Sequence, residues 1–172
     1  MVVPRNLAEL VEKSETIVVG HVVSARAEKH PEFSNLDTVV VTLKVSDTWK
    51  GSAGPTFSFR QYVWDIRDRY DAIGYRKGQE VLLLLVRPSR YGLSSPAGLQ
   101  QGRFRIVRDP QGRKYAVNGF QNRGLFEGVE SQARQKGIDL SPGAVHLVET
   151  HPGGPVALEQ LKQLILQLAA RD

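Results

Sequence analysis

The sequence contains no cysteine. This absence excludes disulfide bonds, thiolate metal ligands, cysteine nucleophiles and Cys-x-x-Cys redox motifs. Long apolar runs are also absent, because the longest one, residues 81–86, falls far short of the ~20 residues that a membrane-spanning helix needs. A chain without cysteine is compatible with the cytoplasm and with a bacterial envelope protein that does without disulfides. Composition therefore leaves the cellular location open.

The N-terminal residues Met1–Asn6 lack the apolar core of a signal peptide. A domain whose leader has been removed would begin in the same way. The start of the chain therefore does not distinguish a cytoplasmic protein from an exported one.

The chain is basic, with 23 Lys and Arg against 18 Asp and Glu and a pI of about 9.6. The charge is unevenly distributed. Residues 60–123 carry thirteen Lys and Arg against five Asp and Glu, whereas the remainder carries ten against thirteen. A basic segment of this kind can bind nucleic acid or another anionic polymer. Arginines that alternate outward on solvated strands also serve solubility, which is the commoner reason for them.

The main pattern in the sequence is a series of short runs in which every second residue is apolar. Residues 38–45 place Val39, Val41, Leu43 and Val45 on one face. A helix cannot use this pattern, because its side chains recur every 3.6 residues, so the run predicts a β-strand.

Five further segments predict strands, giving a total of five to seven. Residues 81–86 are apolar at every position, which predicts a central strand buried on both faces. Gly20 interrupts one of the runs and predicts a β-bulge or a tight bend. Asp109-Pro-Gln-Gly112 is a turn signal that predicts a hairpin over residues 102–118. The predicted strands besides residues 38–45 are 17–23, 57–64, 81–86, 102–108 and 114–118.

Helical patterns stand at the two ends of the chain. Asn6 and Glu9 form a variant of the helix capping box, which predicts a short helix ending near Ser14. Apolar residues fall on one face of a helix over residues 155–170, with Pro155 at its first position. A third, short helix is predicted near residues 128–136.

Together these elements predict a mainly β fold. We expect an OB-fold-like β-barrel of five to seven antiparallel strands, with a short N-terminal helix and a C-terminal helix. Residues 1–172 are expected to form a single domain, with its core in residues 15–118. Residues 119–172 are expected to form a C-terminal extension that ends in the helix.

Four segments together resemble a known family. They are residues 17–22 (IVVGHV), 49–51 (WKG), 78–85 (GQEVLLLL) and 101–106 (QGRFRI). Their arrangement resembles a family of uncharacterised exported bacterial domains with an OB-like barrel, similar in shape to the netrin-like domain of metalloproteinase inhibitors. The match covers residues 7–118 and the closing helix.

The resemblance implies a fold and an exported location, and it implies no catalytic residues. The metalloproteinase inhibitors act through an N-terminal cysteine whose amine and carbonyl chelate a zinc ion. Since this chain has no cysteine, that mechanism does not carry over.

Chemistry-bearing residues form no recognisable motif. The four histidines, His21, His30, His146 and His151, lack the spacing of metal ligands on a shared helix or strand face. No Gly-x-Ser-x-Gly elbow and no phosphate-binding loop occurs. We therefore predict no catalytic residue, no metal ligand and no cofactor.

The best candidate for a ligand-binding face combines aromatic and basic side chains. OB barrels hold extended ligands on the surface of strands 2 and 3. That face could present Arg60, Tyr62 and Trp64, joined by Arg103 and Arg105 from the later hairpin. Aromatics interleaved with arginine suit stacking on bases or sugar rings. In the alternative interpretation, Tyr62 and Trp64 pack inside the protein.

Three functions follow as hypotheses. The first is a non-catalytic, extracytoplasmic binding or interaction module, with its leader removed and an unknown protein or polymeric ligand as partner. The second is a single-stranded nucleic-acid-binding OB protein, which could be cytoplasmic. The third is a hydrolase with an unrecognised site. The sequence leaves the oligomeric state open.

Overall fold

The computed structural model describes residues 3–63 and 74–170. Within them, seven strands form one antiparallel sheet in the order β3-β2-β1-β4-β5-β6-β7. The strands are β1 (Ser14–Lys29), β2 (Asp37–Lys50), β3 (Thr56–Tyr62), β4 (Glu80–Val86), β5 (Arg103–Arg108), β6 (Lys114–Asn118) and β7 (Val156–Ala157). The mainly β, antiparallel fold predicted from the sequence is confirmed.

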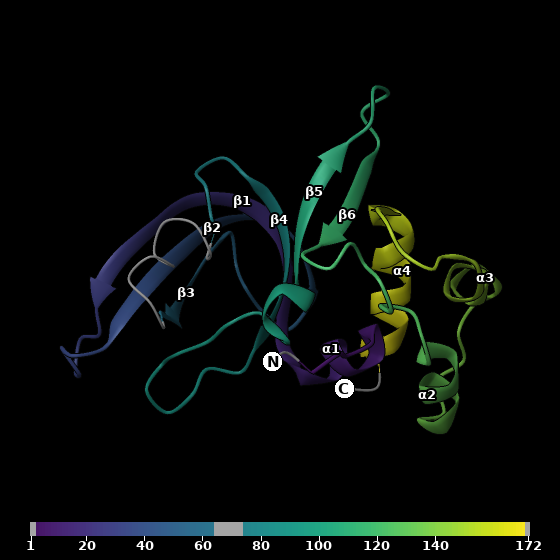
Figure 1. Ribbon diagram of the computed structural model, residues 1–172, viewed down its shortest axis with the longest axis horizontal. Helices are drawn as coiled ribbons and strands as arrows, with labels where there is room; N and C mark the ends of the chain where they lie inside the picture. Colours follow the sequence, from purple (N-terminus) through teal and green to yellow (C-terminus); the bar gives the residue numbers. More distant parts are fainter. Residues whose placement is uncertain (1–2, 64–73, 171–172) are drawn as a thin grey trace.

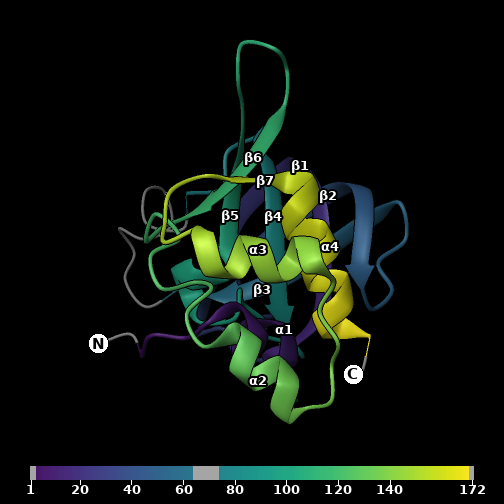
Figure 2. The same ribbon diagram turned by 90° about the vertical axis from the view of Figure 1, so that its right-hand side faces the viewer.

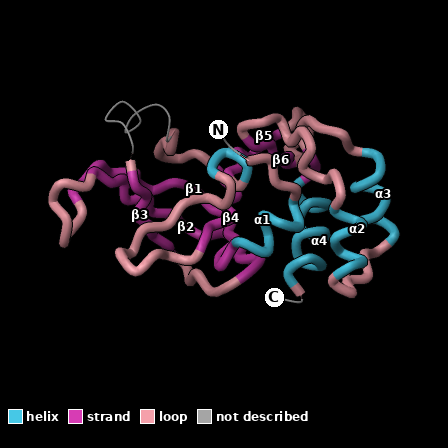
Figure 3. Tube along the Cα trace, turned by 60° about the horizontal axis from the view of Figure 1, so that its bottom comes forward, coloured by secondary structure: helices cyan, strands magenta, loops and turns pink. Residues whose placement is uncertain are grey.

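The helices gather on one side of the sheet. They are α1 (Leu7–Lys13), α2 (Val129–Gln135), α3 (Pro142–Thr150) and α4 (Leu158–Ala169), and a short 3-10 helix, η2 (Leu99–Gln101), precedes β5. Figures 1 and 3 show the helices at one end of the molecule, while β1, β2 and β3 curve away at the other. Figure 2 shows the helices in front of the sheet and the β5–β6 hairpin projecting beyond it. In the described part of the chain, every helix is too short or too polar to cross a membrane.

Two hydrophobic cores lie on opposite faces of the sheet. On β4, Leu82 and Leu84 enter the core beneath the helices, whereas Val81, Leu83 and Leu85 enter a second core inside the curved β1–β3 strands. All five side chains are at most 1% exposed. The predicted central strand buried on both faces is therefore confirmed, and it explains why β4 has no polar position between Glu80 and Val86.

The C-terminal helix is confirmed, but it begins later than predicted. Pro155 does not open the helix, because Val156 and Ala157 first pair with Ala116 and Tyr115 of β6 as an edge strand. Lys162 of α4 then forms an ion pair of 2.8 Å with Asp47 of β2. These contacts fix the helix against the sheet.

The sequence did not predict helix α3. Its nine residues contain a proline and a glycine and carry only a weak apolar pattern.

The predicted barrel closure is not established by strand pairing, and β3 and β7 are the edges of the described sheet. Residues 93–97 lie between β3 and β4, where Leu93 pairs with Arg60 and Pro96 with Leu85. That the chain forms one domain stays a prediction.

Gly20 occupies the bulge that the sequence predicts. The register between β1 and β2 shifts between Val19 and Gly20. A Cβ atom at position 20 would lie 2.5 Å from the carbonyl oxygen of Lys44 on β2, closer than atoms can approach. The two strands can therefore approach each other here only because residue 20 has no side chain.

We predict that Gly20→Ala lowers the free energy of unfolding by about 1–3 kcal/mol, since the extra methyl group must push β2 away. Urea denaturation followed by circular dichroism measures the change. Gly143→Ala is the matched control, because a Cβ atom there meets nothing within 4 Å on α3. The control should keep or slightly raise stability. Equal losses in the two variants would contradict the explanation.

Candidate functional site

Arg60 and Tyr62 lie on the outer face of β3. They alternate with Phe59, which packs in the core inside the curved strands, and Phe59 pairs with Val41 of β2 from the same core. Because side chains alternate along a strand, Arg60 and Tyr62 point to the opposite face. Trp64, the third residue predicted on this face, lies outside the described residues.

Arg103 and Arg105 lie on the other face of the sheet. Arg103 pairs with Leu83 and Arg105 with Val81, and both partners belong to the core inside the curved strands. Directly paired residues of antiparallel strands share a face. The structure therefore does not bring these two arginines onto one surface with Arg60 and Tyr62, and the role of all five residues in ligand binding stays a prediction.

Arg60 is engaged in holding strands together. Its guanidinium donates to Thr38 Oγ1 at 2.7 Å and to Glu28 Oε1 at 2.9 Å. The hydrogen bond from Arg60 holds the pKa of the Glu28 carboxyl below its usual value, although partial desolvation opposes the shift. The Arg60 side chain is only 18% exposed. Its first role in this fold is thus to connect β1, β2 and β3.

Arg103 stacks on Tyr75, with its guanidinium carbon 4.4 Å from the centre of the ring. Burial lowers the pKa of Arg103 and raises the pKa of the Tyr75 hydroxyl, because both charged forms lose hydration. The side chain of Arg105 is exposed. Among Arg60, Tyr62, Arg103 and Arg105, which the structure describes, Arg105 is therefore the one most open to a partner.

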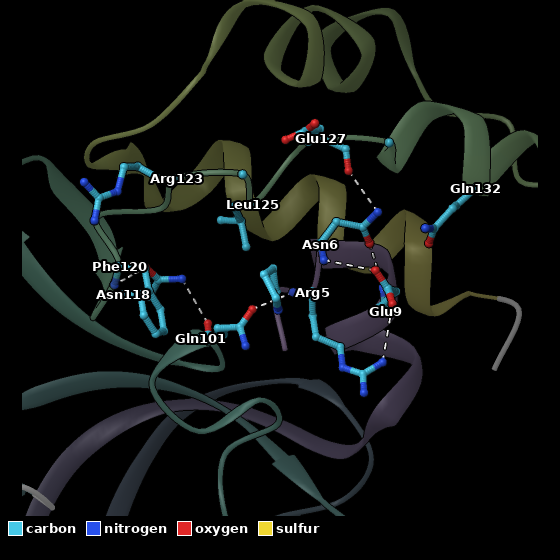
Figure 4. Close-up of a pocket in the computed structure, with 13 residues that line it drawn as sticks. Arg5, Asn6, Glu9, Gln101, Asn118, Phe120, Arg123, Leu125, Glu127 and Gln132 are labelled. Atoms are coloured by element: carbon cyan, nitrogen blue, oxygen red, sulfur yellow. Dashed lines mark hydrogen bonds and ion pairs between the residues drawn. The ribbon is translucent and has the colours of Figure 1, made fainter. Parts of the chain in front are cut away.

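A cavity of about 530 Å³ lies where the N-terminal segment meets the chain that follows the sheet (Figure 4). Residues 4–6 and Glu9 of α1 form one side. Gln101 of η2, residues between 118 and 128, and Gln132 of α2 form the rest. The cavity thus brings together segments far apart in the sequence, and we consider it the candidate site.

A chain of turns forms one wall of the cavity. Along the segment 118–128 alternate backbone N–H groups bond to the carbonyl three residues earlier, as in Gln121 to Asn118, Arg123 to Phe120 and Leu125 to Asn122. Beyond Asn118, the last residue of β6, the segment is therefore hydrogen-bonded along its length without being a helix or a strand. It is hereafter called the turn segment.

Asn122 anchors the turn segment from beneath. Its side chain is fully buried and donates to the carbonyls of Ala116 and Gly154, both at 2.9 Å, while its Oδ1 accepts from Asn118 N at 2.9 Å. Asn118 Oδ1 accepts in return from the backbone N–H groups of Phe120 and Asn122. The two asparagines fix the turn segment to the end of β6 and to the chain before β7.

The opposite side of the cavity is fixed by amide side chains too. Gln101 holds the N-terminal segment at two points, accepting from Arg5 N at 2.7 Å and donating to Val3 O at 2.9 Å. Asn6 caps α1 in a capping box with Glu9, as predicted, and donates to Glu127 O at 2.9 Å across the cavity (Figure 4). The amides of Gln101 and Asn6 are therefore committed to holding the walls.

Charged and aromatic side chains remain exposed around the cavity. Phe120 is 36% exposed, and Arg123 and Glu127 are exposed side chains with no ion pair among the described residues. Figure 4 shows Arg123 beside Phe120 at one edge of the cavity and Glu127 at another. Arg5 and Glu9 form a long ion pair of 3.5 Å and are each about one-third exposed. The mouth thus carries both signs of charge.

Backbone strain concentrates around this cavity. The non-glycine residues with positive φ in the described ranges are Leu99, Gln121 and Asn122, with φ of 57–59°. Leu99 lies in η2 beside Gln101, and the other two lie in the turn segment. Such backbone conformations cost free energy and cluster at functional sites.

Sequence reasoning missed this site, because residues 119–155 show no apolar periodicity. The available signals were the two asparagines spaced four residues apart and the glycines at 124 and 128, which indicate turns. Residues 3–63 and 74–170 contain no group of three or more His, Asp or Glu arranged to hold a metal ion. No protein-family model, no curated protein and no solved structure matches the chain.

We predict that Asn122→Ala lowers the free energy of unfolding by at least about 2 kcal/mol, because three hydrogen bonds of a fully buried side chain are lost. Gln121→Ala is the matched control, since Gln121 has the same positive φ but an exposed side chain. Thermal and urea unfolding of both variants measure the difference. Similar stability of the two variants would show that the Asn122 side chain does not anchor the turn segment.

Proposed function

We propose that this protein is a non-catalytic binding module that acts outside the cytoplasm and holds a segment of a partner protein in the cavity beside the turn segment. One observation carries the proposal. The walls are fixed by amide hydrogen bonds and strained backbone, while Phe120, Arg123 and Glu127 are left exposed at the mouth. Walls that are already ordered reduce the entropy lost on binding.

The lining favours binding over catalysis. The described residues around the cavity include no serine, threonine, histidine, lysine or tyrosine. Those side chains supply most nucleophiles and many general bases, so the carboxylates of Glu9 and Glu127 are the remaining candidates in the lining. Glu127 is exposed at the mouth. The carboxylate of Glu9 accepts a hydrogen bond from Asn6 N and faces Arg5, so it is committed to the capping box.

The size and chemistry of the cavity fit a peptide segment. Its volume of about 530 Å³ lies within the ~300–1,000 Å³ typical of ligand pockets. A polypeptide offers both signs of charge to Arg123 and Glu127, and apolar side chains to Phe120. Leu99 and Val3, both at least half exposed, extend the apolar surface beside it. Aromatic and arginine side chains are those that contribute most to protein interfaces.

Single-stranded nucleic acid is less well supported as the ligand. Of the residues predicted to bind it, Arg60 and Tyr62 lie on one face of the sheet and Arg103 and Arg105 on the other. Glu9 and Glu127 would oppose a phosphate backbone in the cavity.

The OB-like barrel and the exported location belong to the same proposal. Residues 93–97 connect β3 with β4 through Leu93 and Pro96, which supports a barrel-like arrangement of the curved strands. The exported location rests on the resemblance to exported bacterial domains. The gene upstream of the codon for Met1 tests it, and we expect a signal peptide or a lipoprotein signal to be encoded there.

Selection of random peptides displayed on phage tests the proposed ligand class. We expect enriched peptides to bind the purified protein, and Gln132→Trp to weaken their affinity by about tenfold or more, because the indole fills the cavity from α2. Gln135→Trp is the matched control, since Gln135 lies on the same helix but is exposed and does not line the cavity.

The proposal predicts full peptide affinity in the Gln135→Trp variant. Enriched peptides that bind Gln132→Trp as tightly as the unmodified protein would contradict the cavity as the site. Failure to enrich any peptide would contradict the ligand class.

A further inference from the structure

A second surface lies in two loops far from the cavity in the fold. The turn between β1 and β2 carries Phe33, and the loop between β4 and η2 carries Arg90 and Tyr91. Figure 1 shows both loops on the side of the molecule away from α2, α3 and α4. Phe33 is 38% exposed and Tyr91 is 41% exposed. None of these residues lines the cavity.

His30 joins the two loops from beneath. Its side chain is buried, and its Nδ1 accepts from the backbone N–H groups of Glu32 and Phe33 at 3.1 and 3.2 Å. An Nδ1 that accepts carries no proton, so Nε2 carries it and donates to Tyr91 O at 2.8 Å. One imidazole therefore sets the position of both aromatic residues.

The loops are further ordered by their own hydrogen bonds. In the first, His30 N donates to Leu36 O and Leu36 N donates to Phe33 O. In the second, Ser89 Oγ accepts from the N–H groups of Tyr91 and Leu93. Both aromatic residues thus stand on short, internally bonded loops.

The aromatic rings and an arginine contact one another directly. Phe33 and Tyr91 meet edge to face, with ring centres 5.1 Å apart. The Arg90 guanidinium lies 4.8 Å from the centre of the Tyr91 ring and donates to its hydroxyl at 2.6 Å. An arginine has five N–H donors, so Arg90 retains donors for a ligand. These three residues are hereafter called the aromatic platform.

The neighbours of the aromatic platform are polar and exposed. Glu32 precedes Phe33, Ser34 and Asn35 follow it, and Ser89 precedes Arg90. Arg87, earlier in the second loop, is 86% exposed and forms a long ion pair of 3.8 Å with Glu15. Two fixed rings thus form a small apolar surface bordered by hydroxyl and amide groups, the Arg90 guanidinium and one carboxylate, that of Glu32. A protein interface usually needs a broader apolar centre than two rings provide.

We propose that the aromatic platform binds the sugar rings of an acidic polysaccharide. A sugar ring offers a small apolar face of C–H groups bordered by hydroxyls, which matches an isolated aromatic pair in polar surroundings. Arg90 supplies the donors for a carboxylate on the same polymer. The protein would then join a polymer at one end to a protein segment at the other.

Affinity gel electrophoresis with polygalacturonate in the gel tests the proposal on the full-length protein. We expect polygalacturonate to slow the protein, and neutral dextran to slow it less because it carries no carboxylate for Arg90. Phe33→Leu and Tyr91→Leu should each weaken binding about tenfold, because an aliphatic side chain loses the flat aromatic face. Tyr91→Phe keeps that face and should retain most of the affinity.

Leu166→Ala and Arg134→Ala are matched controls. They change an exposed apolar side chain of α4 and an exposed arginine of α2, both outside the aromatic platform. Circular dichroism spectra and melting temperatures of all variants show whether a loss of binding reflects a loss of fold.

Each outcome of the electrophoresis experiment either supports or overturns the binding of acidic polysaccharide by the aromatic platform. Weakened binding in the folded leucine variants, with the controls unchanged, supports it. No retardation by polygalacturonate overturns it, and so does equal retardation of the folded leucine variants, which would indicate general charge attraction. Tighter binding to a short oligothymidylate than to polygalacturonate would assign the platform to single-stranded nucleic acid instead. The phage-selected peptides bind elsewhere, so failure here leaves the cavity proposal standing.

Discussion

The burial of β4 on both faces is the constraint on which the rest of the structure depends. A strand with apolar side chains at every position from Val81 to Leu85 needs a cover on each side of the sheet. The curved strands β1, β2 and β3 supply one cover by bending around their own apolar face. The other cover must come from elsewhere in the chain, and α1 and α4 supply it from its two ends. The fold is thus a sheet with two cores, and its helices belong to only one of them.

The cavity results from the way in which the helices are connected to the sheet. The chain leaves the sheet at Asn118 and returns to it at Val156, so the helices between these points need a fixed connection. The turn segment provides it, and Asn118 and Asn122 replace the ladder hydrogen bonds that a strand would have had. Where the turn segment meets the N-terminal residues held by Gln101, the surfaces do not fill the space between them. The same amides that stabilise the connection therefore form the walls of the candidate site.

The sequence predicts the sheet far better than the sites. Alternating residues such as Val39, Val41 and Leu43 predict a strand directly, because burial on one face of a sheet imposes a period of two. The bulge at Gly20 and the 102–118 hairpin were predictable from a glycine and a turn motif, and both are confirmed. The cavity and the aromatic platform depend instead on side chains such as Gln101 and His30, which bond to residues that are distant in sequence or lie in another loop. No local pattern encodes those contacts. The sequence also could not tell that Arg60 and Arg103 lie on opposite faces of the sheet, because the face to which a side chain points depends on strand register, and register comes from the whole sheet.

The proposed site requires that the turn segment is ordered before any ligand binds. Hydrogen–deuterium exchange of the unliganded protein, followed residue by residue by NMR, measures this most directly. We expect the buried amides of Asn118, Asn122 and Leu125 to exchange about as slowly as those of β4, since their N–H groups are bonded within a fixed wall. Rapid exchange at these three amides while β4 remains protected would contradict it, because the cavity would then lack a preformed wall.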